Sequence, residues 1–191
     1  MPFTIPLVDV IRVLNKAKIS YVLVGAHGLA SWRGKPRATE DVDVVVNAKH
    51  LKKAVKALTA AFPELEPVEL PVVIRLRHRE THSVLIDVMK PVQQPYREVF
   101  RHSRPLRIEG EEVRIPTLEL ALVMKFSAIA SLHRADADKF QDAHDFIYMV
   151  KSNPVRDKDD LVELAALIYP DGGKDLLEMI RKIDAGEKLV L

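Results

Sequence analysis

The sequence predicts a mixed α+β fold, with a core sheet flanked by helices and a helical segment at the C-terminal end. Two observations predict it. Short apolar runs alternate with amphipathic helical patterns over residues 1–115, and from Pro116 onward the spacing of apolar residues is helical throughout. We therefore expect a core over residues 1–115 and a C-terminal helical segment, packed on that core, over residues 116–191.

The composition is that of a folded protein. The chain has 191 residues, of which 48% are hydrophobic and 29% charged. It has no cysteine, which excludes disulfides and thiolate metal sites and fits a reducing cytoplasm. No signal-like or membrane-spanning apolar run is visible, so we expect a cytoplasmic protein without membrane contact.

Charge is unevenly distributed along the chain. Residues 1–115 contain 19 Lys and Arg against 13 Asp and Glu, whereas residues 116–191 contain 10 against 14. A basic half suits a polyanionic partner such as a triphosphate or RNA. A solvated basic surface is an equally common interpretation.

The order of helices and strands follows from apolar spacing and from capping residues. Apolar runs predict strands at 21–24, 72–79 and 83–89, and a hairpin over 106–115. Helical spacing and caps such as Asn47 predict helices over seven ranges: 7–17, 49–62, 93–102, 117–132, 136–151, 157–168 and 174–185.

The most informative stretch is residues 21–46, in which a glycine turn is followed by two aspartates. An apolar strand ends at Gly25, a short helix and a basic loop follow, and the next strand opens with Asp41 and Asp43. Strand side chains alternate, so the two carboxylates share one face, roughly 7 Å apart along the chain. Two such carboxylates repel each other unless a cation such as Mg²⁺ or Mn²⁺ neutralises them.

A third carboxylate, Asp87, lies on a strand that is otherwise apolar on both faces. If that strand lies beside the one bearing Asp41 and Asp43, three carboxylates can hold two metal ions roughly 3.5–4 Å apart. The turn from Gly25 to Gly28 ends a strand and begins a helix, so its backbone N–H groups can receive phosphate oxygens. Together these features predict a phosphoryl-transfer site.

The same residues resemble those of a known superfamily. An apolar strand, a glycine turn, a helix and Asp-x-Asp are the signature of DNA polymerase β-type nucleotidyltransferases. The chain is most similar to the bacterial subgroup of AbiEii-type toxins, since it has Arg37, Thr39, Asp41 and Asp43 in the register Arg-x-Thr-x-Asp-x-Asp. The resemblance is good over about residues 5–90.

The resemblance implies a Mg²⁺-dependent enzyme that moves a nucleoside monophosphate from an NTP to an RNA (such as a tRNA), a protein or a small-molecule acceptor, with an antitoxin as a further partner. Asp41, Asp43 and Asp87 would be its catalytic and metal-binding residues. The chain departs from the pattern because Ala26 follows Gly25, so backbone must supply the contacts of the usual second Gly or Ser. The nucleotide contacts expected from the turn, from the residues near it and from the resemblance are eight: Gly25, Ala26, Gly28, Ser31, Arg33, Arg37, Thr39 and Lys125.

Several charged residues have more than one interpretation. Lys125, within an otherwise apolar helix, either contacts the triphosphate, as the resemblance implies, or extends to solvent. Asp142 and Asp145 lie on one helix face, and a structural network with Arg134 or Lys139 is favoured over a second metal site. The alternating arginines on the strand at 72–79 suit a phosphate track, but a solvated edge strand is the favoured explanation: Arg75, Arg77 and Arg79.

Two other functions remain open on these residues. A non-catalytic protein that binds a nucleotide or a toxin–antitoxin partner would not need all three aspartates. A two-metal nuclease would need the carboxylates but not the glycine turn. The seven histidines have no zinc-ligand spacing.

Overall fold

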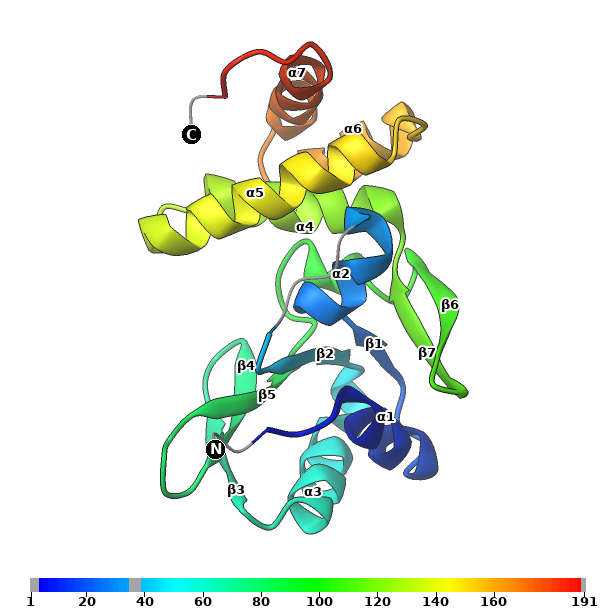
Figure 1. Cartoon of the computed structure of the whole chain (residues 1–191), viewed down its shortest axis with the longest axis vertical. Coiled ribbons are helices and arrows are strands. Elements are labelled where there is room, and N and C mark those ends of the chain that lie inside the picture. The colour runs from blue at the N-terminus through cyan, green and yellow to red at the C-terminus, as the bar shows by residue number, and fades with distance from the viewer. Residues whose placement is uncertain (1–3, 35–38, 190–191) are drawn as a thin grey trace. The chain divides into compact units, whose positions relative to one another are not determined.

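The computed structural model describes residues 4–34 and 39–189, and the chain divides into two compact units (Figure 1). The first unit comprises Met1–Leu29 and Arg37–Pro116, and the second comprises Ala30–Pro36 and Thr117–Leu191. In the part of the chain described, no helix is both long and apolar enough to span a membrane.

The first unit is built on a five-stranded mixed sheet of order β1-β2-β5-β4-β3, which confirms the predicted α+β class. Its strands, in chain order, are β1 Tyr21–Leu23, β2 Val42–Val46, β3 Leu65–Glu69, β4 Val73–His78 and β5 Val84–Met89. Neighbours are antiparallel except for β2 and β5, which run parallel. Strand β5 is central, and the side chains of Leu85, Ile86 and Val88 are buried.

Helices α1 (Leu7–Lys16) and α3 (Leu51–Ala61) lie side by side in this unit (Figure 1). Each buries one apolar face, as the helical spacing predicted: Val10, Ile11 and Leu14 in α1, Ala54 and Leu58 in α3. A short 3₁₀ turn, η1 (Ala48–His50), precedes α3. The predicted Asn47 cap is present, since its side chain accepts a hydrogen bond from the Lys49 N–H.

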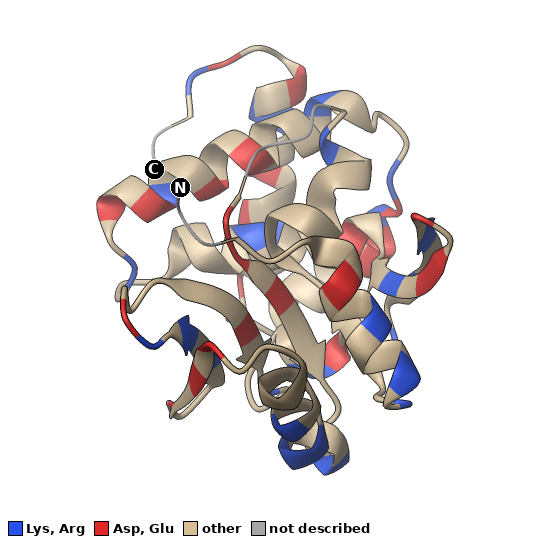
Figure 2. Ribbon diagram, turned by 60° about the horizontal axis from the view of Figure 1, so that its bottom comes forward, with Lys and Arg blue, Asp and Glu red and all other residues tan. Residues whose placement is uncertain are grey.

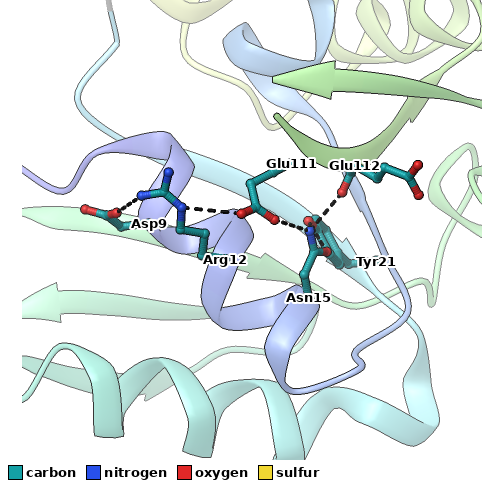
Figure 3. Close-up of polar contacts among 6 residues, drawn as sticks. All are labelled: Asp9, Arg12, Asn15, Tyr21, Glu111 and Glu112. Atoms are coloured by element: carbon teal, nitrogen blue, oxygen red, sulfur yellow. Dashed lines mark hydrogen bonds and ion pairs between the residues drawn. The ribbon is translucent and has the colours of Figure 1, made fainter. Parts of the chain in front are cut away.

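A separate hairpin completes the first unit, with β6 at Ser103–Ile108 and β7 at Glu111–Pro116. Asn15 of α1 joins it to the rest of the unit (Figure 3). Its amide donates to Glu111 Oε2 at 3.1 Å and to the Glu112 carbonyl at 3.0 Å, while its carbonyl oxygen accepts from the Tyr21 hydroxyl at 3.1 Å. Burial raises the pKa of Tyr21 above its usual range, so this hydroxyl remains a donor.

The second unit is helical and contains the four helices predicted from the sequence: α4 Leu118–Ala130, α5 Asp136–Ser152, α6 Lys158–Ala166 and α7 Gly172–Asp184. It also includes the end of α2 (Gly25–Arg33), a helix that begins in the first unit. Thr117 and Asp157 cap α4 and α6 by accepting backbone N–H hydrogen bonds.

Two sequence expectations for the first unit were wrong. The helix expected over 93–102 is reduced to the 3₁₀ turn η2 (Tyr96–Glu98), because Pro95 lacks an N–H and disfavours helical backbone at Gln94. Strand β4 is not an edge strand: the unpredicted β3 pairs with its outer side, so Arg75 and Arg77 lie within the sheet, and Arg79 follows β4.

Candidate active site

Two of the three predicted carboxylates lie on adjacent strands in direct register. Asp43 of β2 and Asp87 of β5 are partners across the parallel pair. Neighbouring strands are about 4.8 Å apart, and residues opposite each other project from the same face of the sheet. The apolar neighbours on β2, Val42 and Val44, are buried, so the rigid core of the sheet holds the two carboxylates.

Asp41 lies immediately before β2, two residues from Asp43. The Thr39 hydroxyl donates a hydrogen bond to Asp41 Oδ1, so the Thr-x-Asp part of the motif is a local contact. Asp41 is also close enough to Asp87 for its negative charge to raise the pKa of that carboxyl. The three aspartates therefore belong to one electrostatic environment.

The side chain of Asp87 is largely buried, with 14% of its surface exposed. Burial raises the pKa of Asp87, the nearby Arg75 guanidinium lowers it, and Asp41 raises it further, with a net rise. Arg75 of β4 is the register partner of Asp87, and its Nε lies 3.6 Å from Asp87 Oδ1. Across three strands, a row of charges thus runs from Arg75 through Asp87 to Asp43.

Gly25 brings the start of α2 against the Asp43 carboxylate. Its φ of +59° is in the left-handed region, and a β-carbon there would lie 1.8 Å from Asp43 Oδ2. The Val24 N–H donates to the Asp43 carbonyl at 2.9 Å, which fixes the turn to β2. The N-terminus of α2, which favours anions, therefore adjoins the carboxylate of Asp43, a residue type that commonly binds metal ions.

Gly28 serves a different purpose in the same turn. A β-carbon there would lie 2.3 Å from the Leu23 carbonyl oxygen, so glycine permits close packing of α2 on β1. Its N–H donates to the Val24 carbonyl at 2.9 Å. That amide is thus used within the fold, whereas Gly25 and Ala26 occupy the first helical positions, where N–H groups lack partners within the helix.

The carboxylates fit a hard divalent cation in their chemistry. Three aspartates supply the oxygen ligands that Mg²⁺ and Mn²⁺ prefer, and Asp87 Oδ1 is buried without a hydrogen bond among the described residues. Within residues 4–34 and 39–189, however, no three His, Asp or Glu side chains converge closely enough to hold a metal ion. Asp43 and Asp87 lie on adjacent strands and Asp41 just before one of them, but their side chains are not drawn together around one point.

Other predicted nucleotide contacts belong to the second unit. Lys125 is buried, and its Nζ lies 2.7 Å from both Asp142 Oδ1 and Asp145 Oδ2. Arg33 is also buried, with its Nε 3.0 Å from Asp145 Oδ1. Asp142 also pairs with Arg134, so the structural network predicted for these aspartates is present, with Lys125 rather than Lys139 at its centre.

The remaining predicted contacts are less constrained. Ser31 is exposed on α2, while Arg37 lies outside the described residues. The nucleotide contacts of Ser31, Arg33, Arg37 and Lys125 stay predictions. Sequence reasoning did not identify Arg75 as the partner of Asp87, although pairing the strands at 72–79 and 83–89 around their short turn would have brought the two residues opposite each other.

Comparison with known proteins gives a consistent result. The family model of the nucleotidyl transferase AbiEii toxin, from type IV toxin–antitoxin systems, matches residues 10–188. No curated protein sequence matches the chain. The structure resembles that of an antigenic nucleotidyltransferase-like protein from Paracoccidioides brasiliensis, with a TM-score of 0.55, 20% identity and coverage of 91% of this chain and 89% of that one.

A second similar structure is that of the lincosamide antibiotic adenylyltransferase LnuA bound to lincomycin. Its TM-score is 0.51 at 17% identity, over 73% of this chain and 93% of that one. At such identities the likeness concerns the fold alone. The family is shown by the sequence match, which extends over almost the whole chain.

Proposed function

The chain belongs to the AbiEii family of nucleotidyl transferase toxins, and from that premise we propose that it transfers a nucleoside monophosphate from an NTP to an acceptor hydroxyl, with Mg²⁺ or Mn²⁺ bound. In this reaction the hydroxyl oxygen forms a bond to the α-phosphorus, the bond to the bridging oxygen breaks, and pyrophosphate leaves. Catalysis of this kind consists mainly of positioning and charge neutralisation.

The observation that carries the proposal is the register of Asp43 with Asp87 beside the Gly25 turn. An anion-binding helix start next to two in-register carboxylates is an arrangement suited to a metal-bound triphosphate. A nuclease would use the carboxylates without needing the turn. A protein that only binds a partner would need neither.

Each residue has a separate role in this proposal. The backbone N–H groups of Gly25 and Ala26 would receive phosphate oxygens. Thr39 holds Asp41 through its hydrogen bond and would keep that carboxylate directed toward the site. Asp87, with its raised pKa, would orient the acceptor hydroxyl and take up its proton.

Asp41, Asp43 and Asp87 would hold the metal, whose bound charge would neutralise the phosphates. Carboxylates that share one electrostatic environment repel one another, and a divalent cation bound among them would offset that repulsion. An NTP complex would supply further oxygen ligands to such a metal.

The acceptor is proposed by class. RNA, a protein side chain and a small molecule all offer the required hydroxyl. LnuA, a lincosamide antibiotic adenylyltransferase, has a similar fold. The family's place in type IV toxin–antitoxin systems supports an antitoxin gene product as a functional partner.

The test is incubation of the purified chain with each α-labelled NTP, Mg²⁺ and total RNA, with Asp43→Asn as the inactive control. Transfer of label to RNA or to the protein, absent in the control, supports the proposal. Shortening of RNA without labelling would indicate a nuclease. If neither occurs while NTP binding is retained, the chain is a nucleotide-binding module under those conditions, and the transferase proposal is wrong for RNA and for the chain itself as acceptors.

A further inference from the structure

The lysines around helix α3 form a cationic surface that the proposed reaction does not use. Lys52, Lys53 and Lys56 of α3 and Lys49 of η1 are all exposed. Positions 49, 52, 53 and 56 follow the i, i+3, i+4, i+7 spacing of one helix face, and the buried Ala54 and Leu58 lie on the opposite face. Figure 2 shows α3 with blue segments and no red ones.

Two more lysines extend this surface. The Ser20 N–H donates to His50 Nδ1 at 2.9 Å, which ties the turn after α1 to the start of α3. Lys16 at the end of α1 and Lys18 in that turn are both exposed. We call the six residues the lysine face: Lys16, Lys18, Lys49, Lys52, Lys53 and Lys56.

The lysine face is not neutralised within the described part of the chain. None of its six members forms an ion pair there, and residues 10–39 and 44–63 contain no Asp or Glu. Lys90 lowers the pKa of Glu69 more than the charge of Lys52 does, and the Glu69 carboxylate is paired with Lys90 at 2.8 Å. By contrast, the charges of α7 are mixed, with Arg181 held by Glu178 and Glu187.

An unneutralised row of like charges has a cost. Like charges three or four residues apart on a helix repel each other and destabilise it. An external polyanion removes that repulsion. The six residues lie on adjoining elements, and all are lysines. A lysine ammonium contacts phosphate as a point charge and lacks the planar, bidentate donor geometry of an arginine guanidinium.

We propose that the lysine face is a docking surface for the phosphate backbone of RNA, bound without sequence preference. RNA is favoured over a membrane because no large apolar side chain of α3 is exposed, so the helix has no apolar face to insert into lipid. It is favoured over an acidic peptide because closely spaced lysines without an apolar anchor suit a continuous line of phosphates. This inference goes beyond the proposed transfer reaction and does not require it.

The experiment measures binding of a fluorescent RNA hairpin at several salt concentrations. The test protein is Lys52→Gln/Lys53→Gln/Lys56→Gln. The matched control removes three exposed lysines of the second unit, Lys151→Gln/Lys158→Gln/Lys174→Gln, with the same change of net charge. We expect the slope of log K against log salt to become shallower by about 2 to 3 in the test variant, and to stay near the wild-type value in the control.

Two further measurements keep the result specific. Replacing the same three lysines by arginine should retain most RNA binding, and thermal unfolding should show the glutamine variant to be at least as stable as wild type, because repulsion has been relieved. The proposal is overturned if wild type binds no RNA, if test and control variants have equal salt slopes, or if the glutamine variant loses binding to phosphatidylserine vesicles or polyglutamate while its RNA binding is unchanged.

Failure of the transfer reaction would be distinguishable from failure of this proposal. Asp43→Asn is expected to bind the hairpin as wild type does, because it is not part of the lysine face. If wild type and Asp43→Asn both bind RNA through these lysines and wild type transfers no nucleotide, the surface stands and the transferase proposal fails. If wild type transfers nucleotide to RNA but the lysine substitutions do not change RNA binding, the transferase proposal stands and the lysine face fails.

Discussion

A β-carbon at Gly25 would lie 1.8 Å from Oδ2 of Asp43, so the glycine turn and the first in-register carboxylate occupy adjoining space. Real β-carbons do not approach other atoms this closely. Glycine at position 25 is therefore required twice, by this contact and by its φ of +59°. The glycine and the aspartate act as one structural unit although 18 positions separate them in the sequence.

This relationship predicts that Gly25→Ala is destabilising and inactive. The left-handed backbone alone costs an alanine about 1–2 kcal/mol, and displacement of the Asp43 carboxylate adds to that and moves a proposed metal ligand. We expect a lower thermal midpoint and loss of nucleotidyl transfer. Circular dichroism melting and the labelled-NTP assay measure the two effects.

Gly110→Ala is the matched control for backbone strain. Gly110 has a φ of +84°, and an alanine β-carbon there would meet no atom beyond its chain neighbours within 4 Å, so only the backbone strain applies. This variant should be less stable than wild type while activity per folded molecule is retained. If both substitutions reduce activity equally, the contact with Asp43 has no functional consequence.

Asp43→Asn and Asp87→Asn should each abolish transfer in a folded protein. The amide keeps the shape of the carboxylate but removes the charge that would hold a metal. An assay at saturating Mg²⁺ tests this, with Asp138→Asn on the exposed start of α5 as a control that should be fully active. Activity near the wild-type level in either site variant would exclude that residue from the site.

The sequence was sufficient for the part of the site that depends on local order along the chain. The glycine turn and the place of Asp43 on β2 are local properties and are where expected, whereas Asp41 lies just before β2 rather than on it. The proximity of Asp87 required strand β5 to pair with β2, and the apolar strand around Asp87 indicated a central position. Arg75 was not identified because its contact with Asp87 depends on the register of β4 with β5, which the spacing of residues within one strand does not show.

The errors in the fold also have physical causes. Strand β3 contains Pro67, which discourages a strand prediction, yet β3 is an edge strand in which a missing N–H is tolerated. The turn at Tyr96–Glu98 had favourable helical composition, but Pro95 interrupts it. The tolerance of Pro67 depends on its place at the sheet edge, which single-chain spacing does not determine, whereas the effect of Pro95 is local.

Lys125→Met should destabilise the second unit strongly. Lys125 lies 2.7 Å from each of two buried carboxylates, Asp142 and Asp145, and breaking a buried pair by removing one partner costs about 3–5 kcal/mol. The lower end is expected, because Asp142 keeps Arg134 and Asp145 keeps Arg33. Denaturant unfolding measures this loss in the free energy of unfolding. Lys139→Met on α5 is the control, whose free energy of unfolding should change little.

The family resemblance also implies that Lys125 contacts the triphosphate. If it does, calorimetric titration of a folded Lys125 variant should show a larger loss of affinity for NTP than for NMP, since the monophosphate lacks the outer phosphates. Equal losses for both nucleotides would leave Lys125 with the ion-pair network as its role.

The last prediction concerns stability in the absence of metal, where Asp87 is ionised in a partly buried site. Its pKa is raised, chiefly by burial and also by Asp41, against a lowering by Arg75. A folded-state pKa above the unfolded value of about 3.9 means that the native state binds more protons between the two values. Stability should therefore rise as pH falls from above the raised pKa toward the unfolded one.

Asp87→Asn should remove this dependence. In chelator the variant should melt above wild type near pH 7, and the difference should shrink as pH falls through the raised pKa, because wild-type Asp87 then becomes neutral as well. Comparison at each pH cancels the titration of the other carboxyls, which both proteins share. With Mg²⁺ and NTP the order should reverse, since only wild type gains the stabilisation of a bound ligand. A variant that melts below wild type in chelator at neutral pH, or that gains equally from Mg²⁺ and NTP, would contradict the assignment of Asp87 to a clustered carboxylate site.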